Sequence, residues 1–200
     1  NCAENSHGIK LKSPPHSAGQ SYTLTFPQSI TNNTFLKTDG SGNLSFASAG
    51  GTNTPAFHAR TSTDQNLTRF TATKIENFVE EFDVGSCFAS NKFTVPSGEG
   101  GKYCIYFSLS CNSGTAGGDG EAIRGDIYKN GSYLNGFRSI LQDNGAFKMY
   151  ISNFAATLTG AATLSAGDYL ELYGYTADQN GSGTIQSNAH TIFGAYKIIE

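Results

Sequence analysis

The sequence predicts an all-β protein, with a ten-stranded sandwich preceded by a short stem that contains a β-hairpin. Among its 200 residues, 24 Gly, 14 Phe and 10 Tyr stand against a single Met and no Trp, a composition that favours strands and turns over helices. Residues 101–111 alternate between apolar and polar positions, as a half-buried strand does. Asn130-Gly131 lies between two short strand-like runs, which is the signal of a tight hairpin turn.

The stretch 101–111 (GKYCIYFSLSC) is expected to be the central strand of the sandwich. Its odd-numbered positions, from Tyr103 to Cys111, form an almost wholly apolar face that belongs in a core. Its even-numbered positions place Cys104 and Tyr106 among small hydroxyl side chains. This second face is too apolar for water and too polar for a dry interior, so it suits an interface between subunits.

The other strands of the sandwich are expected between clusters of Gly, Asn, Asp and Ser. Asn130-Gly131 has the chemistry of a type I′ turn, and residues 165–167 form another tight turn. The complete set of expected strands covers residues 56–60, 70–82 in two pieces, 88–95, 102–111, 122–129, 132–141, 147–158, 168–175 and 190–199.

Three long connections, at residues 112–120, 142–146 and 177–188, are the candidate binding region. If every strand crosses the sandwich once, alternate connections fall at opposite ends, so these three share the end remote from the stem. Loops on a rigid scaffold often carry binding functions, although Gly-rich loops can also be merely solvated. The candidate binding residues are Asn112, Asp119, Glu121, Asp143, Asn144, Asp178 and Asn180.

Residues 1–53 are expected to form a stem and linker, and residues 54–200 the head. In the stem, Asp39-Gly40 lies between two strand-like runs and predicts a hairpin. Asp39-x-Ser41-x-Asn43 is interpreted as that turn, because it lacks the Gly and the distant Glu of a calcium loop. A lone hairpin is marginal in water, so the stem is expected to intertwine with other copies or with the head. The residues expected to be buried there are Tyr22, Leu24, Phe26, Phe35, Leu36, Leu44 and Phe46.

Composition and charge exclude several partners. The net charge is −3, and the Lys and Arg residues are scattered, which argues against nucleic acid. No apolar run approaches the ~20 residues that a helix needs to cross a bilayer, so membrane insertion is not expected. The chain begins at Asn1 without Met, and we expect it to be a fragment of a longer protein.

The sequence offers no motif for catalysis or for a metal site. A hydrolase needs a nucleophile beside a base or a pair of carboxylates, and the acidic run Glu80, Glu81 and Asp83 is interpreted as a solvated strand face. The histidines form no ligand pair, and the cysteines show no CxxC, so the latter are interpreted as buried free thiols rather than disulfides. We therefore expect no enzyme, no catalytic residue and no cofactor. The residues concerned are His7, His16, His58, His190, Cys2, Cys87, Cys104 and Cys111.

Motifs along residues 55–200 resemble the C1q-like and TNF-like trimeric jelly rolls. Gly101-x-Tyr103-x-Ile105-x-Phe107 is similar to their central strand, Leu164-x-x-Gly167-Asp168-x-Leu170-x-Leu172 to the penultimate strand, and Phe193-Gly194-Ala195 to the last strand. The resemblance implies a jelly-roll head that forms a homotrimer, with the first strand near the threefold axis. His58 is expected to be stacked or hydrogen-bonded there, and a metal ligand is the less favoured alternative. Some C1q-like heads bind calcium, so the resemblance also leaves open a calcium site at the long loops. The expected interface residues are His58, Cys104, Tyr106, Phe193 and Tyr196.

The stem carries a second resemblance. Residues 10–27 (KLKSPPHSAGQSYTLTFP) and 35–46 (FLKTDGSGNLSF) are similar to segments that precede the C-terminal head in bacteriophage tail-fibre and related virion proteins. The resemblance implies a receptor-binding head on a virion, whose partner is a host-surface glycan or protein. The alternative is a secreted cellular C1q-like module that binds glycans or proteins.

Overall fold

The computed structural model describes residues 14–19, 21–48, 53–113, 120–142, 154–178 and 183–199. The chain divides into two compact units, Asn1–Gly50 and Gly51–Glu200. The first contains a short 3-10 helix, η1 (His16–Ala18), and the antiparallel hairpin of β1 (Thr34–Thr38) and β2 (Leu44–Ser48), which confirms the hairpin predicted in this region.

Asp39 organises the turn of this hairpin. Its carboxylate accepts hydrogen bonds from the backbone N–H groups of Ser41 (2.8 Å) and Asn43 (3.2 Å) and from Asn43 Nδ2 (2.7 Å). The Asn43 side-chain bond, followed by the Ser41 backbone bond, lowers the pKa of Asp39. The interpretation of this stretch as a turn is therefore confirmed.

Residues 21–27 (SYTLTFP) alternate between polar and apolar side chains, yet this described stretch forms no strand. Only Thr25 makes a bridge, with Asn43, while Tyr22 stays 65% exposed and Phe26 58% exposed. The alternation is therefore not realised as a strand within one chain, and within this unit these aromatic rings lie largely in solvent.

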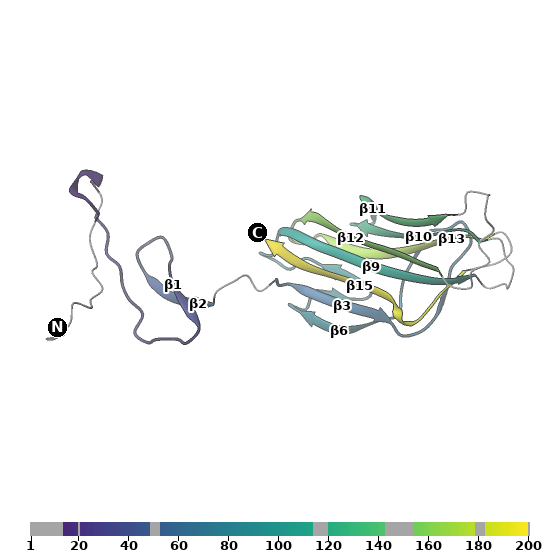
Figure 1. Cartoon of the computed structure of the whole chain (residues 1–200), viewed down its shortest axis with the longest axis horizontal. Helices are drawn as coiled ribbons and strands as arrows, with labels where there is room; N and C mark the ends of the chain where they lie inside the picture. The colour runs from purple at the N-terminus through teal and green to yellow at the C-terminus, as the bar shows by residue number, and fades with distance from the viewer. Residues whose placement is uncertain are drawn as a thin grey trace, which may run out of the picture. The chain divides into compact units, whose positions relative to one another are not determined.

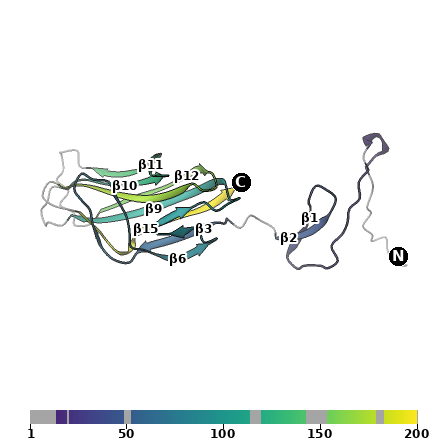
Figure 2. The same ribbon diagram turned by 180° about the vertical axis from the view of Figure 1, so that it is seen from behind.

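The second unit is a two-layer sandwich whose strand pairs are all antiparallel (Figures 1 and 2). One sheet has the order β11-β10-β13-β8-β7, with β5 paired to β13; the other has the order β4-β14-β9-β15-β3-β6, with β12 paired to β9. The strands are β3 (Ala56–Thr61), β4 (Gln65–Asn66), β5 (Thr73–Lys74), β6 (Phe78–Val84), β7 (Phe88–Ala89), β8 (Lys92–Thr94), β9 (Gly101–Ser113), β10 (Gly120–Lys129), β11 (Ser132–Gln142), β12 (Phe154–Leu164), β13 (Tyr169–Asp178), β14 (Gly183–Ile185) and β15 (Asn188–Ile199).

β9 is the central strand, as predicted, and it lies between β12 and β15 in the seven-stranded sheet. The alternating residues from Tyr103 to Cys111 are buried, while Cys104 and Tyr106 on the opposite face are half-buried. The apolar face of β9 therefore lies in the core, as predicted, whereas its second face is neither fully buried nor fully exposed in the single chain.

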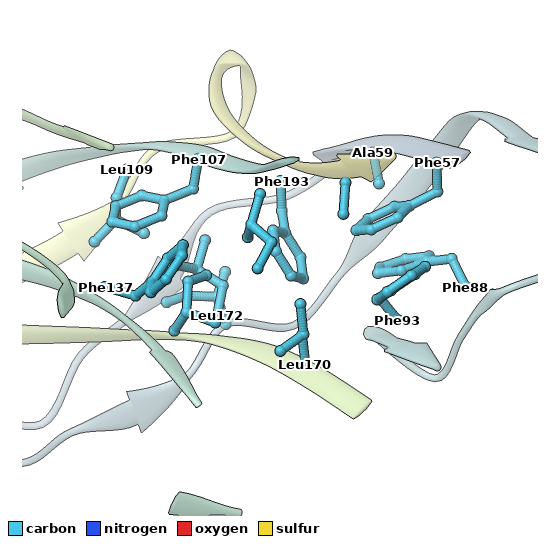
Figure 3. Packing of buried hydrophobic residues seen from close by; sticks show 14 of the residues in the cluster. Phe57, Ala59, Phe88, Phe93, Phe107, Leu109, Phe137, Leu170, Leu172 and Phe193 are labelled. Carbon is cyan, nitrogen blue, oxygen red and sulfur yellow. The ribbon is translucent and has the colours of Figure 1, made fainter. Parts of the chain in front are cut away.

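Aromatic rings fill one end of the core between the sheets (Figure 3). The Phe57 ring stacks on Phe88 and Phe93, with centroids 4.5 and 5.2 Å apart, and meets the edge of Phe193 at 5.0 Å. Phe57 and Phe193 come from one sheet, and Phe88 and Phe93 from the other. The cluster therefore ties the two layers together.

Two predicted strands differ from the observed ones. The stretch 88–95 is a hairpin of β7 and β8, because Ser90 and Asn91 both adopt positive φ (52° and 57°) and turn the chain. Of the strand predicted at 147–158, residues 154–158 belong to β12, which continues beyond the predicted end to Leu164 opposite Gly101. Residues 143–153 lie outside the described part of the chain.

Asp83 is not part of a solvated face, so that interpretation was wrong for this residue. Its Oδ1 accepts hydrogen bonds from the backbone N–H of Cys87 (2.9 Å) and from Cys87 Sγ (3.0 Å), and its Oδ2 accepts one from the Phe88 N–H (3.1 Å). Burial and this carboxylate raise the pKa of the Cys87 thiol, which therefore stays protonated. Asp83 closes the turn that leads the chain from one sheet to the other, whereas Glu80 and Glu81 are exposed.

We predict that Asp83→Ala lowers the free energy of unfolding by about 1–3 kcal/mol, because it leaves hydrogen-bond donors of the turn without their acceptor. Urea denaturation followed by circular dichroism measures the change. Glu80→Ala, an exposed change on the same strand, is the control and should alter stability by less than about 0.5 kcal/mol. Equal stabilities of the two variants would contradict a role for Asp83 in holding the turn.

Candidate functional site

The outward side of the seven-stranded sheet is the candidate functional surface, and we call it the assembly face. Residues directly opposite each other in an antiparallel pair share a face, so the register defines its members. They are Ala155, Thr157, Thr159, Ala161 and Thr163 of β12; Cys104, Tyr106 and Ser108 of β9; Ile192, Gly194 and Tyr196 of β15; Ala56, His58 and Arg60 of β3; and Val79, Phe82 and Val84 of β6.

The centre of the assembly face is a contact that spans three strands. Gly194 lies opposite Tyr106 on one side and opposite His58 on the other. A Cβ on Gly194 would overlap the Tyr106 ring, so the absence of a side chain lets that ring lie across β15. The Tyr106 hydroxyl thereby comes within 2.9 Å of His58 Nδ1.

His58 is held on both sides. Its ring stacks on Tyr106 and on Phe82, with centroid distances of 5.7 and 6.0 Å. Its Nε2 lies 3.4 Å from Glu81 Oε2, and the other oxygen of Glu81 lies 2.9 Å from Arg60 Nε. Within the single chain His58 is thus both stacked and hydrogen-bonded.

The two tyrosines of the face are neutral hydroxyl groups at physiological pH. Burial, followed by the neighbouring Cys104 and Tyr196, raises the pKa of Tyr106. A side-chain hydrogen bond with Cys104 is the largest cause that raises the pKa of Tyr196. The centre of the face therefore offers hydrogen-bonding groups and aromatic surface rather than charge.

Phe193 was wrongly placed among the interface residues. Its side chain is 0% exposed and packs against Phe57 in the core of its own chain. Phe193 and Tyr196 are separated by an odd number of positions in β15, so their side chains point to opposite sides of the sheet. The structure brings together the other four residues, His58, Cys104, Tyr106 and Tyr196.

Exposed apolar side chains extend the assembly face at its β6 edge and near the end of β15. Phe82 is 49% exposed in the single chain, and its neighbours Val79 and Val84 are exposed to a similar degree. Ile198 and Ile199 of β15 are also exposed. Sequence reasoning missed these residues, although the apolar positions of Phe78–Val84 interleave with acidic ones and gave a signal. These side chains are therefore further candidates for a contact region.

The ends of the three long connections meet at one end of the sandwich. Gly120 pairs with Asp178, Ala122 with Gln142, and Gly183 with Ser113. The tight turns lie at the opposite end, where Asn130 Nδ2 donates a hydrogen bond to Asp168 Oδ1 (2.7 Å). The strand ends that flank the three long connections therefore lie together at one end of the sandwich, as predicted.

The candidate loop residues themselves are only partly placed. Asp119, Asp143, Asn144 and Asn180 lie outside the described residues, whereas Asn112, Glu121 and Asp178 belong to the strands β9, β10 and β13. The expected loop 177–188 is wrong in its second half, because β14 pairs with β9 and β4 and buries Ile185 completely. This connection is therefore confined to residues 179–182.

Three further findings bear on the chemistry of the described residues. No group of three or more His, Cys, Asp and Glu side chains among them could hold a metal ion. Cys87 and Cys104 are free thiols. In the part of the chain that the structure covers, no helix has the length and hydropathy needed to cross a membrane.

Solved structures resemble this chain, whereas no protein-family profile and no curated protein sequence matches it. Eiger TNF from S. frugiperda is 11% identical, with 72% of this chain and 92% of that chain covered and a TM-score of 0.55. Murine APRIL at pH 5.0 is 12% identical, with 72% and 98% covered and a TM-score of 0.51. The globular domain of zebrafish complement 1qA protein is 12% identical, with 73% and 98% covered and a TM-score of 0.48.

At these identities the likeness concerns the fold, and that conclusion rests on the first two structures. The two antiparallel sheets, the aromatic core between them and these neighbours together confirm the predicted fold class. The sandwich of this protein therefore has a jelly-roll fold similar to those of Eiger TNF and APRIL.

Proposed function

We propose that this protein is a non-enzymatic recognition head that assembles as a homotrimer through the assembly face. The observation that carries the proposal is the character of that face, which combines the Tyr106, Gly194 and His58 contact with the exposed ring of Phe82. A monomer would leave this aromatic and apolar surface in water. Packing against two further copies would remove it from solvent, at about 25 cal/mol for each Å² of apolar area buried.

We further propose that the head is the receptor-binding end of a phage tail fibre or a comparable virion appendage. The likeness of residues 10–27 and 35–46 to virion proteins supports this assignment. The loops at the end opposite the tight turns would contact a glycan or protein on the host surface. A single set of polar loops binds weakly, and a trimer gains strength through effective concentration.

The alternative is a secreted cellular module of the same fold that binds glycans or proteins. The sequence upstream of Asn1 in the parent gene separates the two. A collagen-like Gly-X-Y stretch or a signal peptide there would favour the secreted module, and virion genes next to it would favour the tail fibre.

We predict that Tyr106→Lys disrupts assembly, because it places an unpaired charge in the contact at a cost of about 3–5 kcal/mol for each subunit. Light scattering at micromolar concentration should give a trimer for the parent and smaller species for the variant. Tyr133→Lys, on the other sheet, is the matched control and should remain trimeric. A monomeric parent, or a Tyr106→Lys variant as trimeric as the control, would refute the proposed interface.

We predict that deletion of residues 1–53 leaves a folded head with a lower melting temperature. The deletion removes the exposed apolar side chains of the first unit, including Tyr22, Phe26 and Ile30, and with them the contacts that they would make with other copies in the assembly. For a chain of this size, each ~1 kcal/mol lost per subunit lowers the melting temperature by about 2–4 °C. Differential scanning calorimetry compares the two proteins, and an unchanged melting temperature would make the stem a passive tether.

We predict that replacing residues 179–182 with Gly-Ser-Gly-Ser reduces adsorption of the labelled head to susceptible cells several-fold, while folding is kept because surface connections tolerate replacement. Ser97→Asp, an exposed change at the tight-turn end, is the control and should adsorb like the parent. If the loop variant with Asp143→Ala and Asn144→Ala added also adsorbs like the parent, the binding site does not lie at the loop end.

A further inference from the structure

The outward side of the six-stranded sheet carries half of the ten tyrosines of the chain, and we call this surface the tyrosine platform. In β13 the outward positions alternate with the buried Leu170 and Leu172. The register places β10 and β11 residues beside them. The platform consists of Tyr128, Tyr133, Tyr169, Tyr173 and Tyr175.

The rings and the neighbouring cations form a connected surface. Tyr128 stacks on Tyr173 with centroids 4.0 Å apart, and Tyr133 meets Tyr128 at 6.5 Å with its plane tilted by 68°. The guanidinium carbon of Arg138 lies 4.5 Å from the centre of the Tyr133 ring, and that of Arg124 lies 4.2 Å from the Tyr175 ring. Each cation is thus laid over the face of a ring, a favourable arrangement.

A buried carboxylate holds the two arginines in place. Asp126 is 1% exposed, and it accepts hydrogen bonds from Arg138 Nε (2.7 Å) and Nη2 (3.2 Å). Arg124 Nε lies 2.8 Å from Oδ2 of the same carboxylate. Because the Nε–H of Arg124 forms no hydrogen bond with any described residue, this contact is an ion pair without a hydrogen bond. Arg138 and Arg124 therefore have few rotamers left to lose when a ligand binds, which is the condition for a preorganised site.

The platform is positively charged in an acidic protein. Its described cations are Lys74, Lys92, Arg124 and Arg138, and its described carboxylates are Asp126 and Glu171, which gives a net charge of +2. The remainder of the sequence holds 9 of the 13 Lys and Arg and 14 of the 16 Asp and Glu, a net charge of −5. The charge on this surface thus has the opposite sign to that of the protein as a whole.

We propose that the tyrosine platform binds a carbohydrate that carries carboxylate groups. The face of an aromatic ring carries partial negative charge, and the C–H groups of a sugar ring carry partial positive charge. The two therefore attract each other. The fork of a guanidinium matches the geometry of a carboxylate, and Arg138, with 39% of its side chain exposed, can use its remaining N–H groups for that purpose. Tyr and Arg together supply stacking area, orientation and charge at low entropic cost.

This surface is distinct from the loop end and from the assembly face, so the inference goes beyond the proposed function. Trimerisation through the seven-stranded sheet would leave the six-stranded sheet on the outside of the assembly. Three platforms would then face outward, and a long polymer with repeated carboxylates could engage more than one of them.

The test is a printed array of uronic-acid, sialic-acid, phosphorylated and neutral saccharides, probed with the labelled full chain. Binding should occur on carboxylated saccharides, and it should weaken as salt is raised from 50 to about 500 mM because the attraction is screened. Tyr133→Ala should lower the apparent affinity about tenfold, whereas Tyr133→Phe, which keeps the ring, should stay within about threefold of the parent. Arg138→Gln should also lower it about tenfold, and near-ultraviolet circular dichroism checks that each variant is folded.

Phe70→Ala is the matched control, because Phe70 is an exposed aromatic residue outside the platform, and it should bind the array like the parent. The inference is overturned if carboxylated saccharides give no signal, if Tyr133→Ala and Arg138→Gln both bind like the parent, or if only phosphorylated saccharides bind. If instead the 179–182 loop variant loses array binding and the platform variants keep it, the glycan site lies at the loop end. In that case the proposed function stands and the platform proposal fails.

Discussion

The structure depends on β9 having two faces that suit two different environments. Its buried face, from Tyr103 to Cys111, supplies the middle of the core, and its other face leads through Tyr106 across Gly194 to His58. The crossing works only when β9, β15 and β3 are in their observed register, because a shift of one residue would move every side chain to the opposite side. One tyrosine thus links packing inside the sandwich to the chemistry of its surface.

The strong signals in the sequence were the ones that combined periodicity with turn chemistry. The alternation in 101–111, the Asn-Gly turn at 130–131 and the Asp-Gly turn of the first unit all became the predicted elements. Each of these three elements is local, so a few neighbouring residues determine whether the strand or turn forms. The position of the long connections at one end followed from counting strand crossings, and the strand ends obey it.

The missed features depend on partners that are distant in the chain or on weak local signals. β12 carries Ala, Thr and Gly where larger residues would have marked a strand, and its pairing with β9 decides its extent. Phe193 was expected at an interface because it belongs to a family-like motif, but the alternation of side chains along β15 turns it into the core. Asp83 acts through hydrogen bonds to the backbone of the following turn. The spacing of residues in the sequence does not predict such bonds. The alternation of Tyr169, Tyr173 and Tyr175 with leucines was visible in the sequence but pointed to no known motif.

The small side chains along the outward row of β12 have a consequence for the entropy of association. Ala155 and Ala161 have no rotamers to lose when they are covered, and the threonines between them have few, whereas a row of Lys or Glu would lose up to about 2 kcal/mol for each residue ordered. The flat row also lets a neighbouring backbone come close. A surface of this composition keeps most of the free energy that burial provides, so β12 is suited to close contact although none of its outward side chains is large.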